Sequence, residues 1–164
     1  MNIKSIIAHV ESLKMAGQQL GLTSKIIYEF GPNRPHIGDD SNATFRGCLG
    51  GDDIGSKSGV YIFSDEHGEE ILYIGKATKN NLHQRVWSHL DTPTRLPSGW
   101  MTFPKCGFKS NTNENAKRAI IDGKAKLHVF TVSQPVETSI LEVYLQVMHF
   151  KENGTLPCFN KQIG

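Results

Sequence analysis

Two short runs of β-forming residues constrain the fold of this chain more than any other feature. The runs span residues 60–63 and 71–74, and a seven-residue polar loop that contains Gly68 separates them. β-Branched and aromatic residues on either side of such a loop are typical of a β-hairpin. The sequence therefore predicts two antiparallel strands at the heart of the domain.

Helical patterns lie on both sides of this hairpin. Residues 2–20 carry apolar side chains at three- and four-residue spacing, which predicts an amphipathic helix. A second stripe of this kind runs from Leu82 to Leu90, and Asn80 or Asn81 is placed to cap that helix.

The C-terminal part predicts one more strand and one more helix. Residues 127–132 alternate as a strand does, and Pro135 suits the first turn of a helix that reaches about Phe150. Gly154 is placed to end that helix. The order of elements predicts an α+β domain with a small, mainly antiparallel sheet flanked by helices.

The chain divides into two parts at a segment rich in glycine, proline and aspartate, residues 31–58. We interpret residues 1–56 as an N-terminal helical appendage with a linker, and residues 57–164 as the main domain. Residues 91–124 show little periodicity and form an insertion in that domain. The sequence leaves open whether the appendage clamps DNA, contacts a second copy or covers the core as a strap.

Composition excludes several classes of protein. No apolar run approaches the roughly 20 residues that cross a membrane, so we expect no membrane association and an intracellular location. The three cysteines, Cys48, Cys106 and Cys158, are far apart and odd in number. This spacing argues against a disulfide framework and against a zinc site.

Positive charge is concentrated in one stretch, although the net charge is only +2. From Lys76 to Lys126 there are ten basic residues against Asp91, Glu114 and Asp122, a net of +7. Aromatic residues are interleaved with this charge, a pattern typical of a nucleic-acid surface. A solvated surface above ordinary core aromatics explains the charge equally well.

Glu142 interrupts a helix that is apolar almost all round. A carboxylate in such a helix is costly to bury unless a cation or several donors satisfy it. We interpret it as a metal ligand or an acid–base group. An edge position, or a structural pair with an arginine, remains the alternative.

Five further residues gain meaning only in combination. Arg85 and His89 are four residues apart and therefore share a helix face. A guanidinium on such a face suits a bound anion. An ordinary surface arginine and a hydrogen-bonded histidine are the simpler explanation. Tyr61 and Tyr73 lie on the paired strands, where tyrosine is common as packing. Gly75, directly after Tyr73-Ile74, lets the backbone turn tightly toward a helix or a ligand.

Taken together, these residues resemble the GIY-YIG nuclease family in order and spacing. The resemblance covers about residues 57–161 and rests on Gly59-Val60-Tyr61, Tyr73-Ile74-Gly75, Arg85, His89, Glu142 and Asn160. Two features depart from the family pattern: Val60 replaces isoleucine in the first motif, and the insertion is longer than minimal members carry.

The resemblance implies a three-stranded antiparallel sheet flanked by helices, and hydrolysis of DNA phosphodiester bonds with one divalent metal. The metal would be Mg²⁺, with Mn²⁺ as a substitute, and Glu142 would ligate it. Arg85 would stabilise the transition state. Tyr61, Tyr73 and His89 would position water or phosphate, and any of the three could act as general base. Supporting roles would fall to Gly75, Lys76 and Asn160.

We expect the insertion to contact DNA. Loops on a rigid scaffold commonly carry specificity, and Trp100, Phe103 and Phe108 would stack on bases; alternatively, they pack the insertion on the domain. The predicted phosphate contacts are Arg95, Lys105, Lys109, Lys117 and Arg118. The expected function is a free-standing DNA endonuclease of the restriction or phage type; the alternative is an inactive nucleic-acid-binding module of the same fold. The oligomeric state is left open.

Overall fold

The computed structural model describes residues 1–15, 22–30, 53–108 and 113–164 of the chain. Its centre is a four-stranded sheet of order β1-β6-β2-β3, in which every neighbouring pair is antiparallel. The strands are β1 (Leu22–Tyr28), β2 (Gly59–Ser64), β3 (Ile71–Ala77) and β6 (Lys126–Val132). The predicted α+β class and the β2–β3 hairpin are confirmed.

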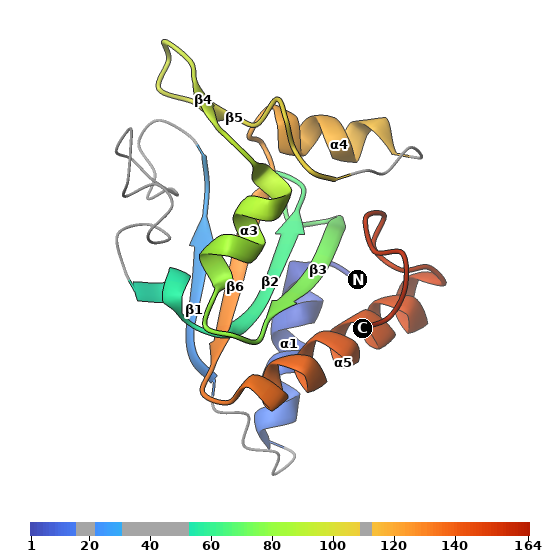
Figure 1. Cartoon of the computed structure of the whole chain (residues 1–164). Coiled ribbons are helices and arrows are strands. Elements are labelled where there is room, and N and C mark those ends of the chain that lie inside the picture. The colour runs from blue at the N-terminus through green and yellow to red at the C-terminus, as the bar shows by residue number, and fades with distance from the viewer. Residues whose placement is uncertain (16–21, 31–52, 109–112) are drawn as a thin grey trace.

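Helices cover both faces of this sheet (Figure 1). They are α1 (Ile3–Met15), α3 (Leu82–Leu90), α4 (Glu114–Ile121) and α5 (Pro135–Asn153), with a short 3-10 turn η1 (Asp53–Ser56). As predicted, α5 has proline in its first turn and ends at Gly154, whose φ of 74° is left-handed. None of the described helices combines the length and the apolarity that a membrane crossing requires.

The alternation of side chains along β2 separates two cores. Val60 and Ile62 face α1 and α5, where the apolar stripe of each helix meets the sheet. Tyr61 and Phe63 face the opposite side, where they pack with the buried residues of α3 and α4. Because all six residues of β2 are buried, this strand is the centre of the domain.

The N-terminal part contributes more than the sequence indicated. Residues 22–28 pair with β6 as an antiparallel edge strand, so the sheet has four strands and not the three that the resemblance implied. Helix α1 buries Ile6 and Val10 in the same core as α5. Of the roles left open for residues 1–56, the described portions fit a strap that covers the core. Residues 16–21 and 31–52 lie outside the described part of the chain.

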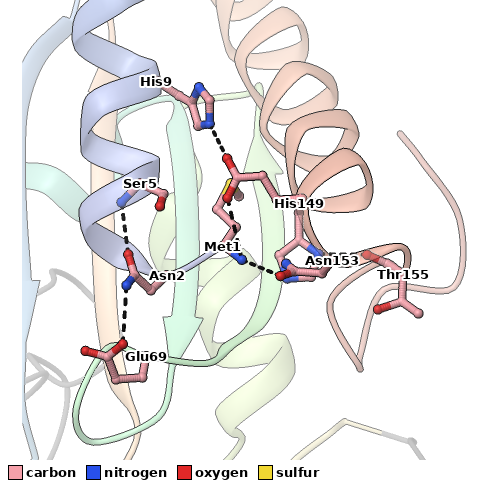
Figure 2. Close-up of polar contacts among 9 residues, drawn as sticks. Met1, Asn2, Ser5, His9, Glu69, His149, Asn153 and Thr155 are labelled. Carbon is pink, nitrogen blue, oxygen red and sulfur yellow. Dashed lines mark hydrogen bonds and ion pairs between the residues drawn. The ribbon is translucent and has the colours of Figure 1, made fainter.

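Polar contacts fix α1 in this place (Figure 2). The side chain of Asn2 accepts a hydrogen bond from the backbone of Ser5 at 3.0 Å and donates one to Glu69 at 3.2 Å. His9 Nε2 lies 2.6 Å from a carboxylate oxygen of Glu152 on α5. The helix is therefore tied both to the β2–β3 loop and to α5.

The insertion is folded onto the domain. It contains a small hairpin, β4 (Thr94–Arg95) and β5 (Met101–Thr102), followed by α4. Phe103 and Phe108 are buried in the core, and the indole N–H of Trp100 donates to the Asp122 carbonyl at 2.9 Å. For Phe103 and Phe108 the prediction of display to DNA is therefore wrong, because the core on the α3 side of the sheet needs them as packing; Trp100 is half-buried, and its role toward DNA stays a prediction.

Candidate active site

Arg85 and His89, four residues apart on α3, lie on the same side of that helix, as predicted. Leu82, Val86 and Leu90 bury one face of the helix, which leaves Arg85 exposed and His89 half-buried beside that face. The ring of His89 reaches the sheet, where its Nε2 lies 3.0 Å from the hydroxyl of Tyr61. The predicted helix residue and the predicted strand residue thus form a direct hydrogen bond.

Burial sets the protonation of this group. It raises the pKa of Tyr61 well above its usual value, and neighbouring Tyr73 raises it further. Burial likewise raises the pKa of Tyr73. Burial, reinforced by the charge of Arg85, lowers the pKa of His89 to about 4. At neutral pH both tyrosines are therefore phenols and the imidazole is uncharged.

Gly75 is required by the rings around it. It pairs with Tyr61 across the β2–β3 ladder, and a Cβ placed there would lie 2.8 Å from Tyr61 Cζ and 2.9 Å from its hydroxyl. The same Cβ would overlap the ring of Tyr73 even more closely. The expectation of a tight backbone turn at Gly75 is wrong, because the residue lies within β3 and makes room for two side chains.

Glu142 approaches the site from the other face of the sheet. Its carboxylate is buried, and Oε2 lies 2.7 Å from the ammonium of Lys76, with no well-aligned hydrogen bond from any described residue. Lys76 is on β3, directly opposite Val60 and on the α5 side of the strand. The buried carboxylate is thus compensated by one lysine, and not by the arginine that the sequence analysis weighed.

A pocket of about 320 Å³ joins these groups at the free edge of β3. Tyr73, His89, Glu142 and Asn160 all line it, together with residues of the C-terminal tail. The fully buried Tyr61 is not part of its lining and lies behind His89. The structure therefore brings four of the predicted residues, from both sheet faces, to one opening, whereas Arg85, Gly75 and Lys76 are not among the residues that line it.

Two amides close the edge strand beneath this pocket. The Asn160 side chain accepts from the Ile74 N–H at 2.9 Å and donates to the Ile74 carbonyl at 2.8 Å. Buried Gln146 also donates to that carbonyl, at 3.1 Å, and accepts from the backbone of Gly164. Sequence reasoning missed Gln146, although its position one helical turn after Glu142 was a usable signal.

The insertion reaches the site through one aromatic ring. Phe108 stacks on His89 with centroids 4.5 Å apart and an interplanar angle of 4°. The backbone of the neighbouring Gly107 donates to the His89 carbonyl at 2.5 Å, and a Cβ at this glycine would meet the carbonyl of Ser88. The insertion thus holds one side of the imidazole in place.

The predicted DNA contacts are dispersed on the surface of the insertion. Arg95 and Lys105 are exposed, and Lys117 is half-buried. Arg118 is exposed and pairs with Asp122 at 3.2 Å, one helical turn away. Lys109 lies outside the described residues. Their role toward DNA stays a prediction.

The donor set around Glu142 fits a weakly held Mg²⁺. Within the part of the chain that the structure describes, no cluster of three or more His, Cys, Asp or Glu side chains could hold a metal ion. Mg²⁺ commonly takes one or two protein carboxylates and completes its shell with water and substrate phosphate. The single buried carboxylate of Glu142 meets that requirement once the Lys76 ammonium, which lies 2.7 Å from Oε2, moves away.

Neither the protein-family models, nor the curated proteins, nor the solved structures contain a match to this chain. Its function is therefore inferred from the geometry of the pocket itself.

Proposed function

We propose that this protein is a metal-dependent endonuclease of the GIY-YIG type that hydrolyses phosphodiester bonds in DNA. The observation that carries the proposal is the hydrogen bond between Tyr61 and an uncharged His89 beside the buried carboxylate of Glu142. Phosphodiester hydrolysis needs a proton acceptor for the attacking water and cations for the developing negative charge. His89, which lines the pocket, would be the acceptor, and Arg85 on the same helix and Lys76, paired with Glu142, would supply the cations.

His89 is the group that we assign as general base. It lines the pocket and is already deprotonated at neutral pH, whereas Tyr73 would first have to lose a proton that its raised pKa retains. An anionic phosphate in the pocket would raise the pKa of the imidazole toward neutrality and strengthen it as a base. Tyr61 and Phe108 orient the ring through a hydrogen bond and a stacking contact.

The remaining residues would stabilise negative charge or hold the metal ion. As water attacks phosphorus, its proton passes to His89, and the bond to the leaving oxygen breaks. The leaving oxyanion then takes a proton from solvent. The guanidinium of Arg85 stabilises the charge on the phosphate oxygens. Glu142 would hold Mg²⁺, which supplies a Lewis acid for the phosphate and lowers the pKa of bound water. Lys76 would then release Glu142 and turn to the phosphate.

The test is incubation of the protein with plasmid and with branched DNA, in Mg²⁺ and in EDTA, followed by mapping of the ends. Glu142→Gln preserves shape and removes charge, so the fold should persist while cleavage falls by orders of magnitude. Glu66→Gln, at an exposed position in the β2–β3 loop, is the matched control and should cleave normally. Equal cleavage by Glu142→Gln and the control would contradict the metal assignment.

One observation favours a second candidate, the inactive nucleic-acid-binding module. The ammonium of Lys76 occupies the position next to Glu142 Oε2 that a metal ion would need. If this pair is permanent, the protein should bind labelled DNA in Mg²⁺ without cleaving it. Glu142→Gln would then lower stability and leave DNA affinity unchanged.

A further inference from the structure

The outward side of α5 carries an apolar stripe that nothing in the described chain covers. We define the α5 stripe as Val136, Ile140, Val143, Val147 and Phe150. Val136, Ile140, Val143 and Phe150 are 66%, 50%, 37% and 51% exposed, and Val147 between them is half-buried. A contiguous exposed apolar patch on a folded domain is typical of an interaction surface.

The spacing of the stripe specifies the shape of its partner. Successive members are four, three, four and three residues apart, which is the a/d pattern of a heptad repeat. The stripe extends along about 21 Å of helix, at about 1.5 Å per residue. Such a seam is complementary to a second helix that carries apolar residues with the same period.

The other described helices do not supply that partner. Helix α1 has already buried Ile6 and Val10 against the sheet, and it touches α5 through His9, which contacts Tyr144 and Glu152. On the helical wheel these two residues lie outside the stripe, so the contacts with His9 leave the stripe uncovered. A complementary helix would therefore have to come from outside the described residues.

We propose that the stripe pairs with the α5 stripe of a second copy of this chain, in antiparallel orientation about a two-fold axis. Self-pairing gives each seam a partner of identical period. Glu137 and Lys151 lie on the same flank of the stripe, near its opposite ends. In an antiparallel pair each copy's Glu137 lies beside the other's Lys151, and the two helix dipoles oppose each other. Parallel pairing would forgo both attractions.

The proposed interface connects the two candidate sites. Glu142 lies on the inward side of the same helix that carries the stripe on its outward side. The dimer would therefore hold two pockets rigidly, one on each side of the helix pair. The interface itself does not depend on the nuclease proposal, because it can be measured without DNA.

Sedimentation equilibrium of the full chain over a wide concentration range tests the inference. The unmodified protein should associate as a dimer. Ile140→Asp places a charge in the seam and should raise the dissociation constant by about 100-fold. Leu96→Asp is the matched control, because Leu96 is 42% exposed and lies in the insertion, and its dissociation constant should not change.

Orientation is tested by Lys151→Glu, which should weaken the dimer by about threefold to tenfold because two repulsions with Glu137 replace two attractions. An unchanged dissociation constant in Lys151→Glu would refute the antiparallel arrangement.

Circular dichroism verifies folding, and Val136→Ser provides a milder seam variant that should also weaken the dimer. A wild-type protein that stays monomeric, or a dimer that survives Ile140→Asp in folded form, would overturn the interface. Monomers that bind lipid vesicles through the stripe would also overturn it.

Discussion

Substituting Gly75 by alanine tests the packing of the pocket most directly. The added Cβ would lie 2.8 Å from Cζ of Tyr61 and would overlap the ring of Tyr73. Ordinary carbon contacts are about 3.5–4.0 Å, so one of the two rings has to move. Tyr61 is completely buried and lies within hydrogen-bond distance of His89, whereas Tyr73 is only half-buried. The strain therefore falls on both the core and the site.

The magnitude follows from the cost of overpacking. Extra methyl groups in a packed core cost about 1–3 kcal/mol. A central value of about 2 kcal/mol lowers the Tm of a domain of this size by about 4–8 °C. Thermal unfolding followed by circular dichroism measures that shift. NMR titration of His89 reports whether the imidazole still has a pKa near 4 when Tyr61 is displaced.

Gly154→Ala is the control for this experiment. A Cβ at that residue meets nothing within 4 Å, so its only cost comes from the left-handed φ of 74°. It should lower Tm slightly and leave the titration of His89 unchanged. If Gly75→Ala has the Tm and the His89 titration of the wild type, the rings are not packed against β3 as described, and the reasoning fails.

Four further predictions concern the pH dependence, the edge strand, Arg85 and the charges of the insertion. Because folding lowers the pKa of His89, the imidazole of the unfolded chain is protonated at a higher pH than that of the folded chain. The free energy of unfolding should therefore fall as the pH drops from about 6.5 toward 4. Urea unfolding of His89→Gln over the same pH range should show a smaller fall. Asn160→Asp removes the donor to the Ile74 carbonyl and should lower the free energy of unfolding, measured in urea, by about 1–3 kcal/mol. A urea midpoint equal to that of the wild type would show that the amide does not stabilise the strand. Arg85→Ala should lower turnover far more than DNA affinity, and equal losses in cleavage and binding assays would make Arg85 a general phosphate contact. The last variant neutralises four basic residues of the insertion together: Lys105, Lys109, Lys117 and Arg118. It should weaken the dependence of DNA affinity on salt concentration. If that dependence is unchanged, DNA binds elsewhere on the protein.

Local patterns predicted most of the helices and strands. The β2–β3 hairpin, α3, β6 and α5 were all found close to their predicted places, because each carries its own periodicity or turn residues. Strand β1 was not predicted, since it is defined by pairing with β6, about 100 residues later in the chain. Backbone pairing at that separation leaves no local pattern in the sequence.

The site was predicted as a set of residues but not as an arrangement. The spacing of Arg85 and His89 specified a shared helix face, and the apolar helix around Glu142 indicated a costly carboxylate. Neither pattern revealed that Lys76 compensates that carboxylate or that Phe108 stacks on the imidazole. Both contacts join segments that are far apart in sequence, so tertiary packing alone creates them.

The free edge of β3 explains how one pocket uses residues from both faces of a sheet. Successive side chains of a strand point to opposite faces, so Gly75 opposes Tyr61 on the α3 side while Lys76 meets Glu142 on the α5 side. In an interior strand a neighbour would separate these two groups. At this edge none of the described strands intervenes, and Asn160 satisfies the backbone groups of Ile74 that a neighbour would otherwise pair. The asparagine therefore does for β3 what another strand would do, while leaving the opening between the two faces that the proposed chemistry needs.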